Sequence, residues 1–149
     1  MNGKRLACAV VPDFLLHVAA SAGLHIWERP HAIAEKEGAA ALLAAVNSLG
    51  MQDGVTVGMT VAQARARCPE LEVTVRNQDH EDEQSGRILK LLQSIGPFVE
   101  EEAPGVYYLQ AAGLTRLYHD ETGLARRILS DLHPANYPVQ VGIAANKLV

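Results

Sequence analysis

Carboxylates suited to metal chemistry occur together in one strand-like segment of this 149-residue chain, where Glu100, Glu101 and Glu102 are consecutive. With Asp13 as a partner from the first segment, Glu100 or Glu102 could hold Mg²⁺ and activate a hydroxyl group. Neighbouring side chains of a strand point to opposite faces, so at most two of the three glutamates can share one site. The simpler interpretation is a solvated strand edge. The acidic residues within 79–83 are more typical of a helix N-terminus than of a metal site.

Other residue patterns of the chain specify no catalytic chemistry. The six histidines have neither HExxH spacing nor a pairing with cysteine, and the serines lack a nucleophile-elbow setting. Cys8 and Cys68 are far apart, which indicates reduced core residues in a cytosolic protein. The formal net charge of −4 opposes tight DNA binding by this stretch alone, because phosphate neutralisation requires a positive excess. No segment approaches the about 20 apolar residues that a membrane span needs.

The elements that would position these side chains can be placed from periodicity and from turn residues. In the first half we predict strands over 6–11, 31–34 and 71–75, helices over 14–22, 38–49 and 61–68, and a loop over 54–58. In the second half we predict a helix capped by Asp79, strands over 98–102 and 106–110, a helix capped by Asp120, and a last strand over 139–143.

Without its inserted residues the chain has the order strand, helix, strand, strand, helix, strand. That order predicts an α+β fold of the ferredoxin-like (βαββαβ) type. Residues 1–12 and 79–149 would form this domain, and residues 13–78 would form a small helical insertion. The order alone is common and hosts many functions, so it does not identify one.

Four local sequences give a more specific signal. Residues 54–60 read GVTVGMT and run into an alanine-rich helix that ends at Cys68-Pro69. Residues 97–100 read PFVE before a Tyr-Leu pair, residues 142–148 read GIAANKL, and residues 6–18 occupy the place of a first strand and helix. In this order they resemble the fingers and palm of Y-family (translesion, UmuC/DinB-like) DNA polymerases. The resemblance covers nearly the whole chain.

The resemblance also implies where the catalytic metal ligands should stand. Polymerases of that family hold two Mg²⁺ ions with one carboxylate from the first strand and an adjacent Asp-Glu pair before the Tyr-Leu pair. Asp13 aligns with a second, less critical aspartate, which places Val11 at the first ligand position. Counting back from Tyr108-Leu109 places Gly105 and Val106 at the other two. All three carboxylates are therefore missing on this alignment.

Other family contacts are changed as well. Ser48 and Met51 align with the tyrosine and arginine that grip the triphosphate, and Leu16 aligns with the aromatic residue that rejects ribonucleotides. Lys147 matches the family's triphosphate-binding lysine and would be a remnant of nucleotide binding. Arg65 and Arg67, on different faces of the predicted helix 61–68, are candidates for contacts with a DNA backbone.

The best-fitting subgroup is the non-catalytic ImuB type, which is found in bacterial SOS mutagenesis operons. Membership would imply no enzymatic activity, no cofactor, and an adaptor role that brings a separate error-prone polymerase to damaged DNA. Members of that family continue into thumb and little-finger domains, so we expect these 149 residues to be part of a longer protein whose DNA and sliding-clamp contacts lie in those regions. The expected location is the bacterial cytoplasm, at the nucleoid when engaged, with no membrane contact.

Two alternatives remain open from the sequence. One is a divergent but active translesion polymerase fragment, in which Glu100 or Glu102 with Asp13 would bind Mg²⁺. The other is a ferredoxin-like regulatory or interaction module unrelated to DNA. A structure in which residues 13–78 form no separate lobe would favour that second alternative.

Overall fold

The computed structural model describes residues 5–111 and 113–144. By its internal contacts the chain divides into two compact units. The first, here called the split unit, comprises residues 1–12 and 82–149; the second, the inserted unit, comprises residues 13–81. The second division lies between residues 81 and 82, inside helix α4 (Gln78–Gln93), whereas the sequence placed it between 78 and 79.

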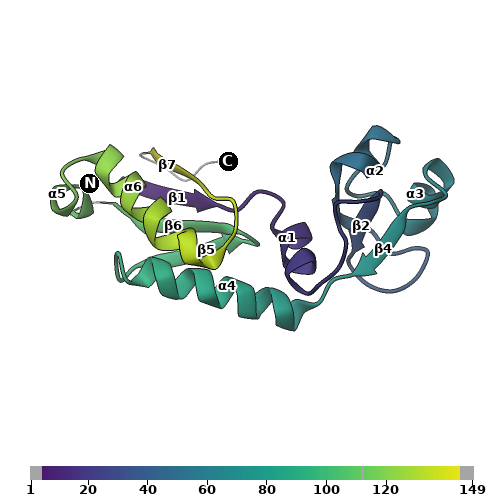
Figure 1. Cartoon of the computed structure of the whole chain (residues 1–149), viewed down its shortest axis with the longest axis horizontal. Helices are drawn as coiled ribbons and strands as arrows, with labels where there is room; N and C mark the ends of the chain where they lie inside the picture. Colours follow the sequence, from purple (N-terminus) through teal and green to yellow (C-terminus); the bar gives the residue numbers. More distant parts are fainter. Residues whose placement is uncertain (1–4, 112, 145–149) are drawn as a thin grey trace. The chain divides into compact units, whose positions relative to one another are not determined.

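The split unit is built on a four-stranded antiparallel sheet with strand order β5-β6-β1-β7. Its strands are β1 (Leu6–Val10), β5 (Val99–Ala103), β6 (Val106–Gln110) and β7 (Gln140–Ala144). Apart from the elements of the inserted unit, the order of the main elements along the chain is β1, α4, β5, β6, α6 (Glu121–Leu132) and β7. The ferredoxin-like order is therefore confirmed (Figure 1). The short α5 (Leu114–Leu117) and the 3₁₀ helix η1 (His133–Ala135) flank α6.

Helix α6 begins where the sequence indicates, and α4 does not. The side chain of Asp120 accepts a hydrogen bond from the Gly123 N–H at 2.8 Å, so the predicted cap is confirmed. In α4 the predicted cap at Asp79 is wrong. Asn77 precedes the helix and accepts a hydrogen bond from the His80 N–H at 3.1 Å, which leaves Asp79 as a favourable charge in the first turn.

The inserted unit has a three-stranded sheet with strand order β3-β2-β4, in which β2 pairs antiparallel with β3 and parallel with β4. Its strands are β2 (His31–Ala34), β3 (Leu43–Val46) and β4 (Glu72–Val75). Its helices are α1 (Phe14–Ser21), α2 (Ser48–Gln52) and α3 (Val61–Arg67). The insertion, expected to be a small helical one, therefore holds its three helices around a mixed sheet, and the strands predicted over 31–34 and 71–75 are two of the three strands in that sheet.

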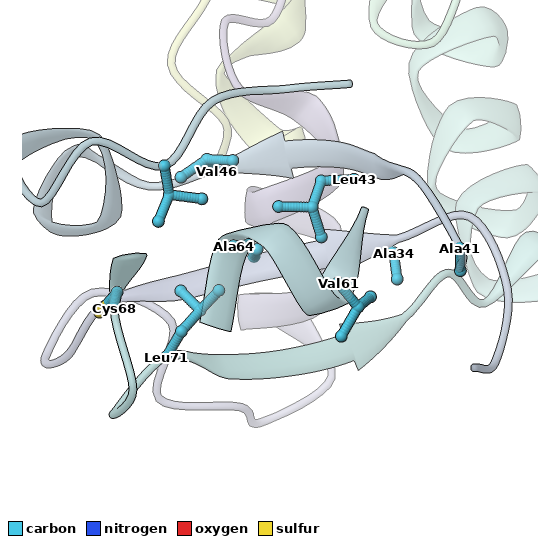
Figure 2. Packing of buried hydrophobic residues seen from close by; sticks show 10 residues of the cluster. Ala34, Ala41, Leu43, Val46, Val61, Ala64, Cys68 and Leu71 are labelled. Carbon is cyan, nitrogen blue, oxygen red and sulfur yellow. The ribbon is translucent and has the colours of Figure 1, made fainter. Parts of the chain in front are cut away.

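Helix α3 covers one face of this sheet. Val61 and Ala64 of the helix lie in one buried apolar cluster with Leu43 and Leu71 (Figure 2). The opposite face carries Ile33, which packs with Leu16 of α1 and with Ile26. Apolar side chains on both faces of β2 explain why all four of its residues are buried.

The predicted helix over residues 38–49 is also wrong. Alanine and leucine favour helices in isolation, but here Leu43 and Val46 are buried on a strand that pairs with β2. Asn47 then starts α2 by accepting a hydrogen bond from the Gly50 N–H. Tertiary burial overrides local propensity in this segment.

Across the part of the chain that the structure describes, none of the helices combines the length and the apolar character that crossing a membrane requires.

Candidate functional site

The three positions expected to carry metal ligands meet at one end of the β1–β6 pair. Val10 lies opposite Val106 in the antiparallel register. The Val11 N–H, immediately after β1, donates a hydrogen bond of 2.8 Å to the Gly105 carbonyl oxygen. Val11 is therefore a neighbour of Gly105 and Val106 in space, although more than 90 residues separate it from them in the chain. The fold could bring three carboxylates together here if the sequence supplied them.

The backbone at Gly105 is specific to glycine. Gly105 has a φ of 78°, and Ala103 and Val106 pair across the turn that it closes. Proline followed by a residue with positive φ is typical of a type II turn, and Pro104-Gly105 supplies both. An L-amino acid in this conformation costs roughly 1–2 kcal/mol. The turn therefore disfavours any side chain at this ligand position.

The residues present at this end do not fit a magnesium ion. Val11 is 3% exposed and Val106 is half-buried, and both side chains are aliphatic. Mg²⁺ requires oxygen ligands, with charged carboxylates preferred. No side-chain oxygen is supplied by residues 11, 105 and 106, so no catalytic step is assigned to a metal at this site.

The glutamates of β5 are divided between the two faces of the sheet. Glu101 accepts a hydrogen bond from the Ser85 hydroxyl of α4, and that hydroxyl also bonds to Tyr107 at 2.8 Å. Tyr107 is fully buried, and this burial raises the pKa of its phenol. Glu100 lies opposite Tyr108 and therefore on the other face. Glu101 thus belongs to a structural hydrogen-bond network and offers no shared site with Glu100.

One other group of potential metal ligands occurs among the residues that the structure describes. Asp53, Cys68 and Glu70 of the inserted unit place their ligand atoms within 4.8 Å of one another. The Cys68 thiol donates to Asp53 Oδ2 at 3.4 Å. Burial and this hydrogen bond raise the pKa of Cys68, which disfavours the thiolate that a metal would need. The group is accounted for by its own hydrogen bonds.

Three of the positions aligned with nucleotide contacts, Leu16, Ser48 and Met51, lie in the inserted unit. Ser48 and Met51 are on α2 and are exposed, but neither carries the phenol or guanidinium that would grip a triphosphate. Leu16 is 1% exposed and packs with Ile26 and Ile33. A residue buried in this way contributes to the core and is not available to contact a sugar.

Three basic residues are candidates for contacts with DNA or nucleotide. Arg65 and Arg67 are both exposed on the last turn of α3. Lys147 lies outside the described residues. Within the described part of the chain, Arg65 makes no ion pair, and it lines a cavity of about 660 Å³ beside β4.

Sequence inspection did not identify this cavity, here called the β4 groove. Its lining includes Leu24, Arg29, His31, Arg65, Glu72 and Thr74. His31 is buried, its Nε2 atom lies 2.7 Å from the Thr74 hydroxyl, and burial lowers the pKa of its imidazole. The groove depends on which strand ends the sheet, and no local motif in the sequence specifies that.

Comparison with known proteins places this geometry in context. Residues 11–149 match the model of the impB/mucB/samB family. No match was found among curated proteins. The solved structure of DinB from Sulfolobus solfataricus matches with 23% identity and a TM-score of 0.79, covering 96% of this chain and 42% of its own.

Two further solved structures are similar to this chain. A post-insertion binary complex of Dbh DNA polymerase matches with 23% identity and a TM-score of 0.81, covering 96% of this chain and 42% of its own. A Y-family DNA polymerase chimera of Dbh and Dpo4 matches with 20% identity and a TM-score of 0.80, covering 96% and 43%. The chain spans about four-tenths of the length of these polymerases, and likeness at such identities concerns the fold.

Proposed function

This chain belongs to the impB/mucB/samB family, and we propose that it is a catalytically inactive, Y-family DNA polymerase-like protein that acts as an adaptor. In this role it recruits a separate error-prone polymerase to damaged DNA during translesion synthesis. The corresponding subgroup is the ImuB type of the bacterial SOS response. The alternative of a module unrelated to DNA has lost its support, because the chain belongs to this family.

One observation carries the proposal. Val11, Gly105 and Val106 meet where the metal ligands of an active relative are expected, and they provide two aliphatic side chains and a glycine. Phosphoryl transfer in such enzymes depends on metal ions that neutralise the charge developing in the transition state. Without ligands for these ions, the remaining functions of the fold are binding and positioning.

The proposed partners are DNA, a separate error-prone polymerase and the sliding clamp. The inserted unit carries nine acidic and five basic side chains, so it is a poor polyanion-binding surface. We therefore propose that the thumb and little-finger regions of the full protein make most DNA contacts. Arg65, Arg67 and Lys147 are secondary candidates.

Thermal unfolding tests the loss of nucleotide and metal binding. We expect no rise in melting temperature when MgCl₂ or MnCl₂ is added together with a deoxynucleoside triphosphate. A ligand present at 100 times its dissociation constant would stabilise the protein by about 2.7 kcal/mol, which is several degrees for a domain of this size. DinB polymerase under the same conditions is the positive control. A rise that requires both metal and nucleotide would favour the active-polymerase alternative.

Primer extension by the full-length protein tests the adaptor role. Alone, it is expected to extend no primer with either metal. Added to the error-prone replicative-type polymerase of the same bacterium, it is expected to increase extension past a template lesion at low polymerase concentration, because recruitment raises the local concentration. Extension that is unchanged by the protein at every polymerase concentration would contradict the adaptor role.

A further inference from the structure

The outer edge of β4 is unpaired within the inserted unit. β4 is the last strand in the order β3-β2-β4. The N–H groups of Glu72 and Arg76 donate to carbonyl oxygens on the β2 side, at 3.0 and 2.9 Å. Successive residues of a strand direct their backbone groups to opposite edges, so the N–H and C=O groups of Val73 and Val75 point away from β2. No strand in the described residues of this unit pairs with that edge.

Residues from both faces of the sheet line the β4 groove beside this edge. Arg65 extends from α3, which covers the face that carries Leu71 and Val73. His31 bonds to Thr74 on the opposite face, where Leu24 forms part of the wall. Val73, whose backbone N–H and C=O groups point away from β2, is itself one of the residues that line the groove.

We propose that the β4 groove binds an extended polypeptide segment of a partner protein, which adds a strand to β4. Outward N–H and C=O groups in a groove are the features by which strand addition is recognised. A peptide backbone satisfies both kinds of group in register, and alternate side chains of the peptide would enter the two walls.

The one basic side chain of the groove that makes no ion pair within residues 5–111 and 113–144 favours an acidic residue in that segment. Glu28, which also lines the groove, lies 3.2 Å from His25. Arg29 donates to Glu72 at 3.2 Å, so its charge is already paired. Arg65 is exposed and makes no ion pair with a described residue. A carboxylate of the bound segment would accept hydrogen bonds from the Arg65 guanidinium. Nucleic acid is disfavoured as the occupant, because acidic residues outnumber basic ones in the inserted unit.

This inference deepens the proposed adaptor function and rests on it, since it assigns the partner polymerase a docking surface. It is tested by equilibrium binding of the full-length protein to the error-prone replicative-type polymerase of the same bacterium. Val73→Pro removes one outward N–H and leaves the bonds to β2 in place, because proline is tolerated at an edge position that faces away from the sheet. Arg65→Glu reverses the unpaired charge, and Arg126→Glu on α6, at an arginine that is likewise exposed and makes no ion pair with a described residue, is its matched control.

We expect Val73→Pro to weaken binding about fivefold and Arg65→Glu about tenfold, while Arg126→Glu changes it less than about twofold. Equal affinity of the unaltered protein and the three variants for the polymerase would contradict the proposed role of the β4 groove and would leave the adaptor role unaffected. Failure of the unaltered protein to bind would overturn the adaptor role together with the groove. Weakened binding of primer–template DNA with unchanged polymerase binding would overturn the polypeptide assignment. If Val73→Pro unfolds at a lower temperature than the unaltered protein, the comparison of Arg65→Glu with Arg126→Glu, both at exposed positions, decides.

Discussion

Replacing Val11 and Gly105 by aspartate and Val106 by glutamate is expected to create a divalent-metal site. The three positions meet at the end of the β1–β6 pair, so their carboxylates would converge on one ion. Mg²⁺ or Mn²⁺ should bind the triple variant measurably by calorimetry and should not bind the natural chain. This result would establish that the alignment of these positions is right.

Without metal, the same variant should lose about 3–5 kcal/mol of unfolding free energy. Val11 is 3% exposed, and an unpaired carboxylate in such a place is strongly destabilising. The φ of 78° at residue 105 adds a smaller cost, which aspartate tolerates better than most residues. Saturating metal should return part of this loss in urea unfolding, because the ion binds only the folded state.

The matched control carries asparagine at residues 11 and 105 and glutamine at residue 106. It has nearly the same shape and no negative charge, so metal should leave its unfolding curve unchanged. A folded carboxylate variant with no metal response would show that the ligand positions are misplaced. If the triple variant fails to fold, the pair Gly105→Asp and Val106→Glu gives the same comparison without the buried charge.

Asn47→Ala is expected to destabilise the inserted unit by about 3 kcal/mol. The Asn47 side chain is 2% exposed and makes four hydrogen bonds. It donates to the carbonyl oxygens of Ile26 and Arg29, both at 2.7 Å, and accepts from the N–H groups of His31 and Gly50 at 3.1 and 2.9 Å. Truncation leaves several of these backbone groups buried without partners, at about 1 kcal/mol each.

Trp27 is the only tryptophan and lies in the inserted unit, so its fluorescence in urea reports this loss. Asn77→Ala is the matched control. Asn77 also caps a helix, but through one exposed hydrogen bond, so its loss should cost about 1 kcal/mol. Equal losses in the two variants would show that Asn47 acts as a simple cap and does not join the loop before β2 to the sheet.

The arrangement of the split unit was predictable because its signals are local. Apolar periodicity and the Pro104-Gly105 turn placed β1, α4, β5, β6 and β7, and Asp120 marked the start of α6. The expected ligand positions could likewise be named from short motifs, and the structure brings them together.

The inserted unit was less predictable. The sequence predicted β2 and β4, at residues 31–34 and 71–75, but it did not predict β3, because that strand depends on distant partners. β3 consists of alanine, leucine and valine in a stretch that resembles a helix, and only pairing with β2 and burial under α3 make it a strand. The β4 groove was missed for the same reason. Whether β4 ends the sheet depends on strand order, which residues 72–75 do not encode locally.

The left-handed backbone at Gly105 limits what this turn can carry. With a φ of 78°, the position favours glycine, and any other side chain adds a conformational cost whatever its chemistry. An acid at residue 105 would lie beside Val11 and Val106, whose side chains hold no oxygen atom. A side chain placed there alone therefore lowers stability and supplies only a fraction of the oxygen ligands that a hard cation needs.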